Sequence, residues 1–382
     1  MDSVVLFDDI FFDVAQTGIA RYWRNLLENL KSSAAYSDSE TEIVILNRSD
    51  KLSGLGFREI PFPAYDHWQP ASDRFKLIEV CSSLDVSLFV SSYYTFVPGI
   101  KNLLPIYDLI PEKMGFARLN RTWLERELAI EFADHFLSIS QSTSNDLSRI
   151  YGKDPERIYL AKPGVDRNVF NSFEIGVTAT FAEKYGLFRY IVFVGNRKDY
   201  KNGRLLLELL EKEQQKDLQV VFVGGGPPDH AENRLMRKIP DKLFFLDLND
   251  EEFRECMKSS VCLVYPSEYE GFGLPVLEAL SCGIPVIAFD NSSIREAGGD
   301  LVVYLSENTT DGLCSALGRV GENSLRNKVK ELGPIHAEQM NWTTTAENFL
   351  TAVDKTLQSD YKDLNKDSLF IKQTKWSYLT NR

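Results

Sequence analysis

The stretch Tyr265-Pro-Ser-Glu-Tyr-Glu-Gly-Phe-Gly-Leu-Pro-Val-Leu-Glu278 has the pattern of a strand end, a tight turn and the start of a helix. An apolar run ends at Tyr265, and Gly271 and Gly273 let the backbone turn tightly after it. Pro275 then suits the first turn of a helix. The unpaired N–H groups and the positive dipole end of such a helix form an anion site that suits phosphate.

Two carboxylates stand on either side of this helix start. Glu270 lies just outside the helix and Glu278 about one turn inside it, so both can flank a ligand at the helix terminus. Carboxylates accept hydrogen bonds from sugar hydroxyls. A phosphate-sized anion with hydroxyl-bearing groups on both sides describes a sugar nucleotide. The alternative is that Glu270 only caps the helix and Glu278 belongs to its solvated face.

Short apolar runs alternate with amphipathic segments in both halves of the chain, which is typical of parallel strands joined by crossover helices. We therefore predict an α/β protein with two doubly wound parallel-sheet domains, at residues 1–175 and 176–358. A helix from about Thr343 to Leu357 precedes a polar tail, 359–382, whose aromatic residues are expected to pack back on the first domain. The predicted strands are Val4–Phe7, Ile43–Leu46, Val86–Val90, Leu104–Tyr107, Phe136–Ile139, Ile158–Ala161, Tyr190–Val194, Gln219–Val223, Leu243–Leu246, Val261–Tyr265, Pro285–Phe289 and Leu301–Tyr304.

Composition narrows the class of protein. The chain has 382 residues, of which 43% are hydrophobic and 26% charged, so it can bury a full core. The 43 Lys and Arg residues are outnumbered by 55 Asp and Glu residues, for a net charge of −12. Since no basic arm or stripe stands out, nucleic-acid binding is disfavoured. No apolar run approaches the roughly 18–20 residues that span a bilayer, and no basic segment leads into a long apolar run at the N-terminus. We expect a cytoplasmic protein, with peripheral contact to the inner face of a membrane left open.

Neither a metal nor a cofactor is expected. The five cysteines are far apart, have no zinc-type spacing, and are interpreted as reduced core thiols. No Asp-x-Asp triplet is present, and the adjacent Asp8 and Asp9 would point to opposite sides of a strand. Val223-Gly224-Gly225-Gly226 is not the dinucleotide motif, because Asp229 stands where its last glycine would be. Positive charge at a bound diphosphate must then come from the helix terminus and from Arg or Lys.

The segment from Glu270 to Glu278, followed by Cys282-Gly-Ile-Pro-Val286, resembles glycosyltransferase family 4. Members of this family are retaining sugar-nucleotide transferases with the GT-B fold, in which two Rossmann-like domains face each other across a cleft. The resemblance extends from about Gln16 to Thr351. It implies the same fold and the same class of reaction here.

The resemblance also implies a donor site. Thr17-Gly18-Ile19 resembles the family's N-terminal glycine loop, and Phe193-Val-Gly195-Asn196-Arg197 leads to Lys201 in the segment that neutralises the diphosphate. The family often has Arg just before this Lys, but Tyr200 stands there, so the second cation is assigned to Arg197. Preorganised cations stabilise the leaving diphosphate in the transition state. The predicted donor-binding residues are Gly18, Gly195, Asn196, Arg197, Lys201, Gly224, Leu248, Glu270, Gly271, Phe272, Gly273, Leu274 and Glu278, of which Glu270, Lys201 and Arg197 are also predicted to be catalytic.

The acceptor side is assigned to the first domain. Relatives often have His where Tyr107 stands, and Asp108 is a fourth candidate catalytic residue that either holds hydroxyl groups or only caps the following turn. The loops 57–70 and 93–100 carry aromatic side chains, Tyr93 and Tyr94 among them, that either stack on sugar rings or fill the core.

We therefore predict a retaining, metal-independent hexosyltransferase. The breadth of the family favours UDP-glucose as donor, then GDP-mannose, and a hydroxyl of a glycan or lipid-linked saccharide as acceptor in polysaccharide biosynthesis. None of the four histidines lies in the Gly18 loop or beside Asp108, where an inverting enzyme would need a base. The alternatives are a catalytically silent sugar-nucleotide-binding subunit and a GT-B epimerase or phosphorylase. The oligomeric state is left open.

Overall fold

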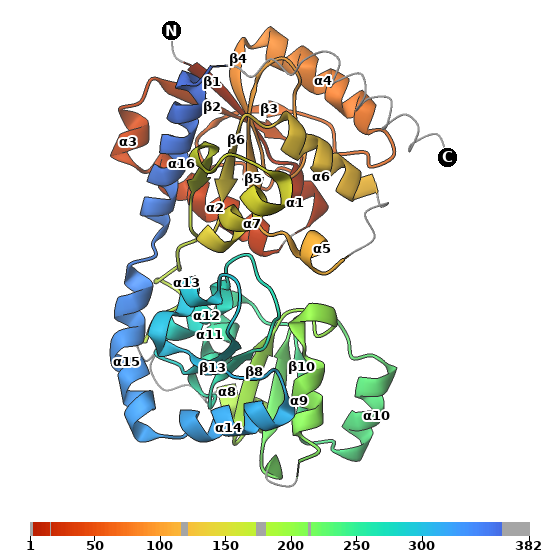
Figure 1. The fold of residues 1–382 in the computed structure, drawn as a ribbon, viewed down its shortest axis with the longest axis vertical. Helices are drawn as coiled ribbons and strands as arrows, with labels where there is room; N and C mark the ends of the chain where they lie inside the picture. The colour runs from red at the N-terminus through yellow and green to blue at the C-terminus, as the bar shows by residue number, and fades with distance from the viewer. Residues whose placement is uncertain (1–2, 16, 116–120, 173–180, 213–214, 361–382) are drawn as a thin grey trace. The chain divides into compact units, whose positions relative to one another are not determined.

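The computed structural model describes residues 3–15, 17–115, 121–172, 181–212 and 215–360 (Figure 1). The chain divides into two compact units. Unit 1 comprises Met1–Lys162 and Trp342–Arg382, and unit 2 comprises Pro163–Asn341. Each unit contains one fully parallel sheet flanked by helices, as the alternating sequence pattern predicts.

Unit 1 contains a seven-stranded sheet in the order β3-β2-β1-β4-β5-β6-β7. Its strands are β1 (Ser3–Asp8), β2 (Thr41–Asn47), β3 (Arg58–Pro61), β4 (Val86–Ser91), β5 (Lys101–Ile106), β6 (His135–Ser138) and β7 (Ile158–Leu160). Its helices are α1 (Ile10–Val14), α2 (Gly18–Lys31), α3 (Ala34–Ser37), α4 (Pro70–Ser83), α5 (Ile110–Lys113), α6 (Arg121–Phe132), α7 (Gln141–Tyr151) and α16 (Trp342–Gln358).

Alternating strand residues build a core on each face of this sheet. Val5 and Phe7 of β1 pack with α2 and α16, whereas Leu6 packs on the opposite face with Leu77 of α4. This alternation follows from the two-residue period of a strand. Helix α2 buries a large aromatic residue, Trp23, whose ring lies edge-on to Phe349 of α16 at 5.7 Å.

Unit 2 contains a six-stranded sheet in the order β10-β9-β8-β11-β12-β13. Its strands are β8 (Tyr190–Val194), β9 (Gln219–Val223), β10 (Leu243–Leu246), β11 (Leu263–Tyr265), β12 (Val286–Phe289) and β13 (Val303–Leu305). Its helices are α8 (Phe181–Tyr185), α9 (Arg204–Leu209), α10 (His230–Lys238), α11 (Asp250–Lys258), α12 (Leu274–Ser281), α13 (Ile294–Gly298), α14 (Thr310–Val320) and α15 (Asn323–Glu338).

The structure adds one strand and moves one helix relative to the sequence prediction. β3 was expected to be loop, because Arg58 and Glu59 interrupt any apolar run; it is an edge strand that pairs only with β2. Helix α16 was assigned to the second domain but belongs to unit 1, where Trp342 and Phe349 contact Tyr22 and Trp23. The boundary between the units also falls after Lys162 rather than after residue 175. The predicted packing of the tail lies outside the described residues from position 361 onward.

The described parts of the chain contain no helix that is long and apolar enough to cross a membrane. Over the same residues, no group of three or more His, Cys, Asp or Glu side chains is arranged to hold a metal ion. All five cysteines are unpaired, and burial raises the pKa of the Cys81 and Cys262 thiols to about 12. These thiols therefore stay protonated and behave as small core residues.

Candidate active site

The candidate donor site lies where the strand order of unit 2 reverses. β8 and β11 are neighbours in the sheet, and the chain continues outward from them in opposite directions. In open parallel sheets, ligands bind beyond the carboxyl ends of the strands at such a switch point. Lys201 follows β8 and Glu270 follows β11, so the two side chains come from the two strands that define this point.

Lys201 and Glu270 form an ion pair. The Lys201 Nζ lies 2.9 Å from Glu270 Oε1 and 3.5 Å from the Tyr265 hydroxyl, and the two charged side chains are 17% and 10% exposed. Gly195 has φ +104°, and a Cβ there would lie 3.7 Å from the Lys201 Cδ. The positive φ favours glycine at this position, and the lysine stem packs against it at ordinary contact distance. The structure brings these two predicted catalytic residues into direct contact.

Glu270 is held by a loop that the sequence analysis missed. Its backbone N–H donates to Ser292 Oγ at 3.1 Å, and its carbonyl accepts from Ser293 Oγ at 2.8 Å. Asn291 donates to the carbonyl of Ser267 at 2.7 Å in the same region. These residues directly follow β12, so their position at the carboxyl end of a neighbouring strand is the signal that identifies them.

The N-terminus of α12 has the predicted form. Gly273 precedes the helix with φ +102°, and no side chain caps its first turn. The positive φ requires glycine at this position, and a Cβ there would also displace the end of the Ile294 side chain, 2.8 Å away. Gly271 and Phe272 are buried beside it, and Leu274 is half-buried.

Glu278 lies on α12, one helical turn after Leu274, and is buried rather than solvated. Burial and then the Glu270 charge raise the pKa of the Tyr265 phenol well above its usual value, and the Glu278 charge adds to this. Both carboxylates therefore act electrostatically on one buried phenol. This favours the interpretation of Glu278 as a site residue over that of a solvated helix face.

Arg197 is predicted to supply a second cation at the diphosphate, and in the structure its guanidinium has other partners. Its buried guanidinium pairs with Glu232 of α10, with Nε 2.8 Å from Oε1. The same group donates to the carbonyls of Gly224, Gly226 and Pro227 at 3.0–3.2 Å. These hydrogen bonds hold the glycine turn after β9.

This glycine turn packs closely against the loop after β8. Gly224, Gly225 and Gly226 have φ values of +69°, +74° and +77°. A Cβ on Gly225 would overlap the carbonyl oxygen of Gly195, whereas a Cβ on Gly224 or Gly226 would meet nothing within 4 Å. The turn thus fixes the backbone next to Gly195.

Two other predicted donor residues lie in loops at this end of the sheet. Asn196 is exposed, and its Oδ1 accepts the Lys198 N–H at 3.1 Å. Leu248 is half-buried between β10 and α11, just before the Asn249 cap of that helix.

Tyr107 serves the core of unit 1. Its hydroxyl donates to the Ser92 carbonyl at 2.7 Å and accepts the indole N–H of Trp23. Burial raises the pKa of Tyr107 well above the ordinary value for a phenol. The hydroxyl hydrogen is therefore engaged within the core of unit 1, and the acceptor-side role of Tyr107 stays a prediction.

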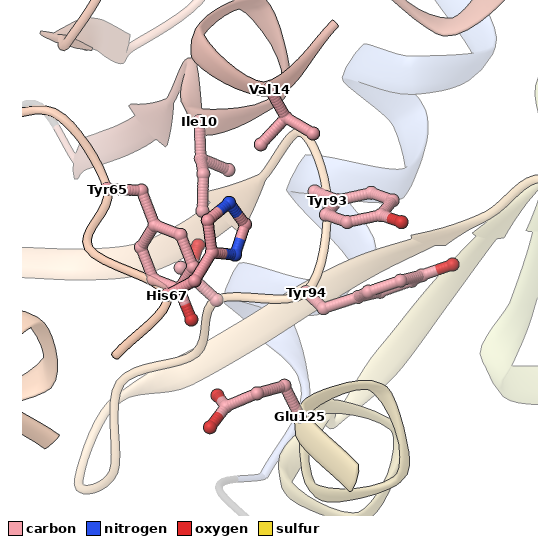
Figure 2. Close-up of a pocket in the computed structure, with 8 residues that line it drawn as sticks. Ile10, Val14, Tyr65, His67, Tyr93, Tyr94 and Glu125 are labelled. Atoms are coloured by element: carbon pink, nitrogen blue, oxygen red, sulfur yellow. The ribbon is translucent and has the colours of Figure 1, made fainter. Parts of the chain in front are cut away.

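The remaining unit 1 candidates have mixed outcomes. Asp108 Oδ1 accepts the Ile110 N–H at 3.0 Å, so this residue does cap the following turn. Gly18 is exposed at the start of α2, with open space where a Cβ would stand. Tyr93 and Tyr94 are half-buried and stacked at 3.8 Å, and both line a pocket in unit 1. Tyr93 and Tyr94 therefore remain candidates for contact with a ligand (Figure 2).

The geometry within unit 2 suits an anionic, hydroxyl-bearing ligand. An ammonium group, an uncapped helix terminus and two buried carboxylates lie around the end of β11. The cationic elements attract phosphate, and the carboxylates accept hydrogen bonds from hydroxyl groups.

Known proteins resemble this chain in sequence and in fold. The profile of the family Glycosyl transferases group 1 matches residues 181–331. The chain is 27% identical over 281 residues to the alpha-maltose-1-phosphate synthase of Mycolicibacterium smegmatis, which covers 66% of this chain and 72% of that protein. It is 26% identical over 249 residues to the D-inositol 3-phosphate glycosyltransferase of Gordonia bronchialis, over 60% of this chain and about half (54%) of that relative. The structure of Anabaena Alr3699/HepE in complex with UDP-glucose shares the fold, with a TM-score of 0.71 at 13% identity over 92% of this chain and 99% of that one.

Proposed function

Because the chain belongs to the glycosyl transferases group 1 family and has the GT-B fold, we propose that it is a retaining hexosyltransferase whose unit 2 binds the sugar-nucleotide donor. The acceptor is a hydroxyl of a glycan or of a lipid-linked saccharide. The observation that carries this proposal is the Lys201–Glu270 pair at the switch point, beside the uncapped start of α12.

Each group has a role that follows from its charge. Lys201 and the N-terminus of α12 bind the diphosphate, and they stabilise the negative charge that it gains as it leaves. Glu270 accepts hydrogen bonds from the sugar hydroxyls once the diphosphate has drawn Lys201 away from it. Glu278 accepts hydrogen bonds from the ribose. Arg197 and Glu232 support the site indirectly by holding the glycine turn beside Gly195.

The reaction proceeds on one face of the sugar. The acceptor oxygen forms the new bond to the anomeric carbon while the bond from that carbon to the β-phosphate oxygen breaks. The acceptor proton passes to an oxygen of the leaving β-phosphate, so no protein base is needed. The configuration at the anomeric carbon is retained, and the nucleoside diphosphate leaves with the bonding electron pair.

UDP-glucose is the first candidate donor, and GDP-mannose is the second. The structural relative from Anabaena is described in complex with UDP-glucose, and an O-antigen chain mannosyltransferase of Escherichia coli is 26% identical over 232 residues. We propose that transfer does not require a metal, since Lys201 and the helix terminus supply positive charge. Activity should therefore persist in EDTA.

Calorimetric titration of UDP, GDP, UDP-glucose and GDP-mannose in EDTA tests the donor site. One nucleotide sugar should bind, and Glu278→Ala should raise its dissociation constant about tenfold or more, since a hydrogen bond to a charged group is worth ~1.5–3 kcal/mol. Glu251→Ala, at an exposed position on α11, is the matched control and should bind like the wild type. Equal affinities for Glu278→Ala and the wild type would refute the role of Glu278.

The same preparation distinguishes the alternative functions. A transferase releases nucleoside diphosphate faster when an acceptor is added, whereas an epimerase converts the donor with no acceptor present. A catalytically silent binding subunit binds the donor without turnover. Chromatographic analysis of the nucleotide and sugar products separates the three outcomes.

A further inference from the structure

The hydroxyl group of Tyr265 reaches the Lys201–Glu270 pair, although the side chain is buried. Tyr265 is the last residue of β11 and is 3% exposed. Its hydroxyl oxygen accepts a hydrogen bond from Lys201 Nζ at 3.5 Å, and the Glu270 carboxylate is the acceptor for the phenol hydrogen. One phenol therefore contacts both members of the ion pair that is proposed to bind the donor.

Other buried tyrosines of this chain donate their hydroxyl hydrogen to the main chain. Tyr22 donates to the Ala161 carbonyl at 2.9 Å, and Tyr190 donates to the Cys256 carbonyl at 2.7 Å. Such a hydrogen bond is structural, because it gives a buried main-chain acceptor a partner. The hydroxyl group of Tyr265 instead contacts two charged side chains, which a role in packing alone does not require.

The loops after β8 and β11 are tied together by Asn202, the residue after Lys201. Its Nδ2 donates to the Pro266 carbonyl at 3.3 Å and to Glu268 Oε1 at 3.1 Å. The backbone of Glu270 is held by the serine side chains that follow β12, as described above. A ligand can therefore move the Lys201 ammonium group and the Glu270 carboxylate without moving the strands behind them.

Lys201 also has two aromatic neighbours. Its Nζ lies 5.4 Å from the centroid of the Tyr265 ring and 5.7 Å from that of the Tyr200 ring. An ammonium group within about 6 Å of the face of an aromatic ring is attracted to that ring. This attraction depends on the rings and not on their hydroxyl groups. Tyr265→Phe therefore removes the hydroxyl group and keeps the aromatic neighbour of Lys201.

Glu270 needs another hydrogen-bond donor when the diphosphate engages Lys201. The Glu270 side chain is only 10% exposed, and a carboxylate in such a position is costly without donors. The Tyr265 phenol can donate, because burial and then the charge of Glu270 hold its pKa well above the ordinary value and keep it protonated. This donor stays beside Glu270 after the ammonium group has left.

We propose that Tyr265 is a positioning residue, whose hydroxyl group holds the Glu270 carboxylate in the orientation that receives the sugar hydroxyls after Lys201 has moved to the diphosphate. This inference rests on the transferase function proposed above. Tyr265 acts through Glu270 and not by touching the donor. Its hydroxyl group should therefore matter for the sugar part of the donor and not for the nucleoside diphosphate part.

Calorimetric titration in EDTA tests this role with two pairs of probes, UDP with UDP-glucose and GDP with GDP-mannose. For the pair that the wild type binds, the sugar preference is the Kd of the nucleoside diphosphate divided by the Kd of the sugar nucleotide. Tyr265→Phe should lower the sugar preference at least fivefold and change the Kd of the nucleoside diphosphate less than twofold.

A double variant tests whether Tyr265 acts through Glu270. Glu270→Ala removes the carboxylate that Tyr265 is proposed to hold, and it should lower the sugar preference by itself. Adding Tyr265→Phe to Glu270→Ala should then lower the preference by less than a further twofold, because residues that act in one network are not additive.

Tyr190→Phe is the matched control. It removes the hydroxyl group of a similarly buried tyrosine of unit 2, at the start of β8 and not at the end of β11. Its sugar preference should equal that of the wild type. Thermal unfolding of each variant shows whether it is folded at the temperature of the titration.

Three results would overturn the role of Tyr265: an unchanged sugar preference in folded Tyr265→Phe, an equal loss of affinity for both probes of the pair, or effects of Tyr265→Phe and Glu270→Ala that multiply in the double variant. Equal loss for both probes is what a purely structural role would give. Each of these results leaves the donor site standing, because the wild type still binds the donor. A wild type that binds none of the four probes refutes the donor proposal, and the role of Tyr265 with it.

Discussion

Glu232→Gln tests whether Arg197 holds the glycine turn or serves the donor phosphates. The substitution keeps the size of the side chain and one acceptor oxygen, but it removes the charge that Arg197 faces at 2.8 Å. If Arg197 were a phosphate ligand restrained by Glu232, the variant would release it and bind the donor more tightly. If Arg197 holds the turn, the variant should lose stability locally and gain no affinity.

The expected cost follows from burial. The Arg197 and Glu232 side chains are 5% and 6% exposed, and removal of one partner from a buried ion pair costs about 3–5 kcal/mol. Arg197 keeps its hydrogen bonds to three carbonyls, so we expect the lower end, about 3 kcal/mol. Such a loss corresponds to about a hundredfold faster hydrogen exchange of the most protected amides.

Hydrogen exchange with mass spectrometry is the appropriate assay, read on peptides that cover β8, β9 and α10. Tryptophan fluorescence serves as an internal control, because the four tryptophans in the described part of the chain, Trp23, Trp68, Trp123 and Trp342, belong to unit 1. Breaking the exposed Lys212–Asp311 pair with Lys212→Ala is the matched control and should leave hydrogen exchange in these peptides unchanged. A change below about 1 kcal/mol in Glu232→Gln, or tighter donor binding, would refute the reasoning.

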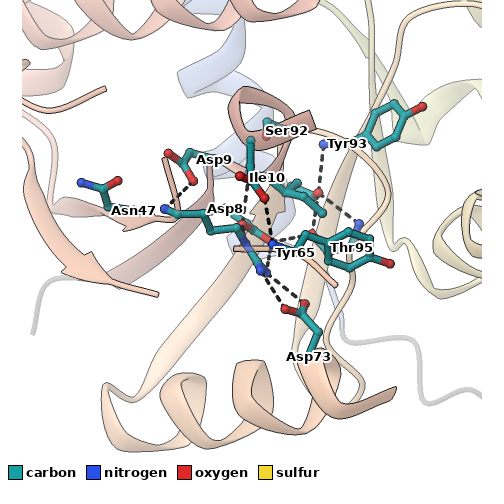
Figure 3. Close-up of polar contacts among 12 residues, drawn as sticks. Asp8, Asp9, Ile10, Asn47, Tyr65, Asp73, Ser92, Tyr93 and Thr95 are labelled. Carbon is teal, nitrogen blue, oxygen red and sulfur yellow. Dashed lines mark hydrogen bonds and ion pairs between the residues drawn. The ribbon is translucent and has the colours of Figure 1, made fainter. Parts of the chain in front are cut away.

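Four other substitutions, used in three tests, examine the structural roles of individual residues. Gly225→Ala should destabilise unit 2 more than Gly226→Ala in urea unfolding. Both positions have positive φ, but only the Cβ at position 225 would overlap a backbone atom. Equal losses of unfolding free energy in the two variants would contradict this. Burial raises the pKa of Asp9 (Figure 3) to about 6, so the charged form of Asp9 destabilises the fold, and the free energy of unfolding should fall as the pH rises from about 4 to 6. Asp9→Asn should remove that part of the wild-type pH profile. Parallel profiles for the variant and the wild type would contradict this. Tyr107→Phe should cost about 1–3 kcal/mol in urea unfolding, because it leaves the Trp23 indole N–H unpaired; an unchanged free energy of unfolding would contradict this.

Sequence reasoning could predict those parts of the structure that depend on local pattern. The central strands are apolar runs of four or more residues, and the helix start at Gly273 follows from glycine and proline placed one after the other. The Lys201–Glu270 contact was also within reach, because both residues follow strands of one sheet. β3 could not be predicted in this way, because an edge strand that is paired on one side only needs no apolar run.

Interactions with partners that are distant in sequence could not be predicted. Arg197 was assigned by its proximity in sequence to Lys201, but its orientation is decided by Glu232, which is 35 residues away. Tyr107 was assigned by its place in a motif, and its hydroxyl is taken by Trp23 and Ser92 in the core. The placement of α16 depended on aromatic residues of α2 that lie more than 300 residues earlier in the chain.

Because α16 belongs to unit 1, the two units are completed in a fixed order during synthesis. The chain leaves unit 1 after Lys162 and re-enters it at Trp342, so unit 2 is an insertion within the first unit. A ribosome delivers all of unit 2 before it delivers α16. Until then, Tyr22 and Trp23 lack the rings of Trp342 and Phe349 that cover them in the finished protein. Unit 2 is therefore expected to complete its fold before unit 1, and chaperones should bind the still incomplete unit 1 of the nascent chain.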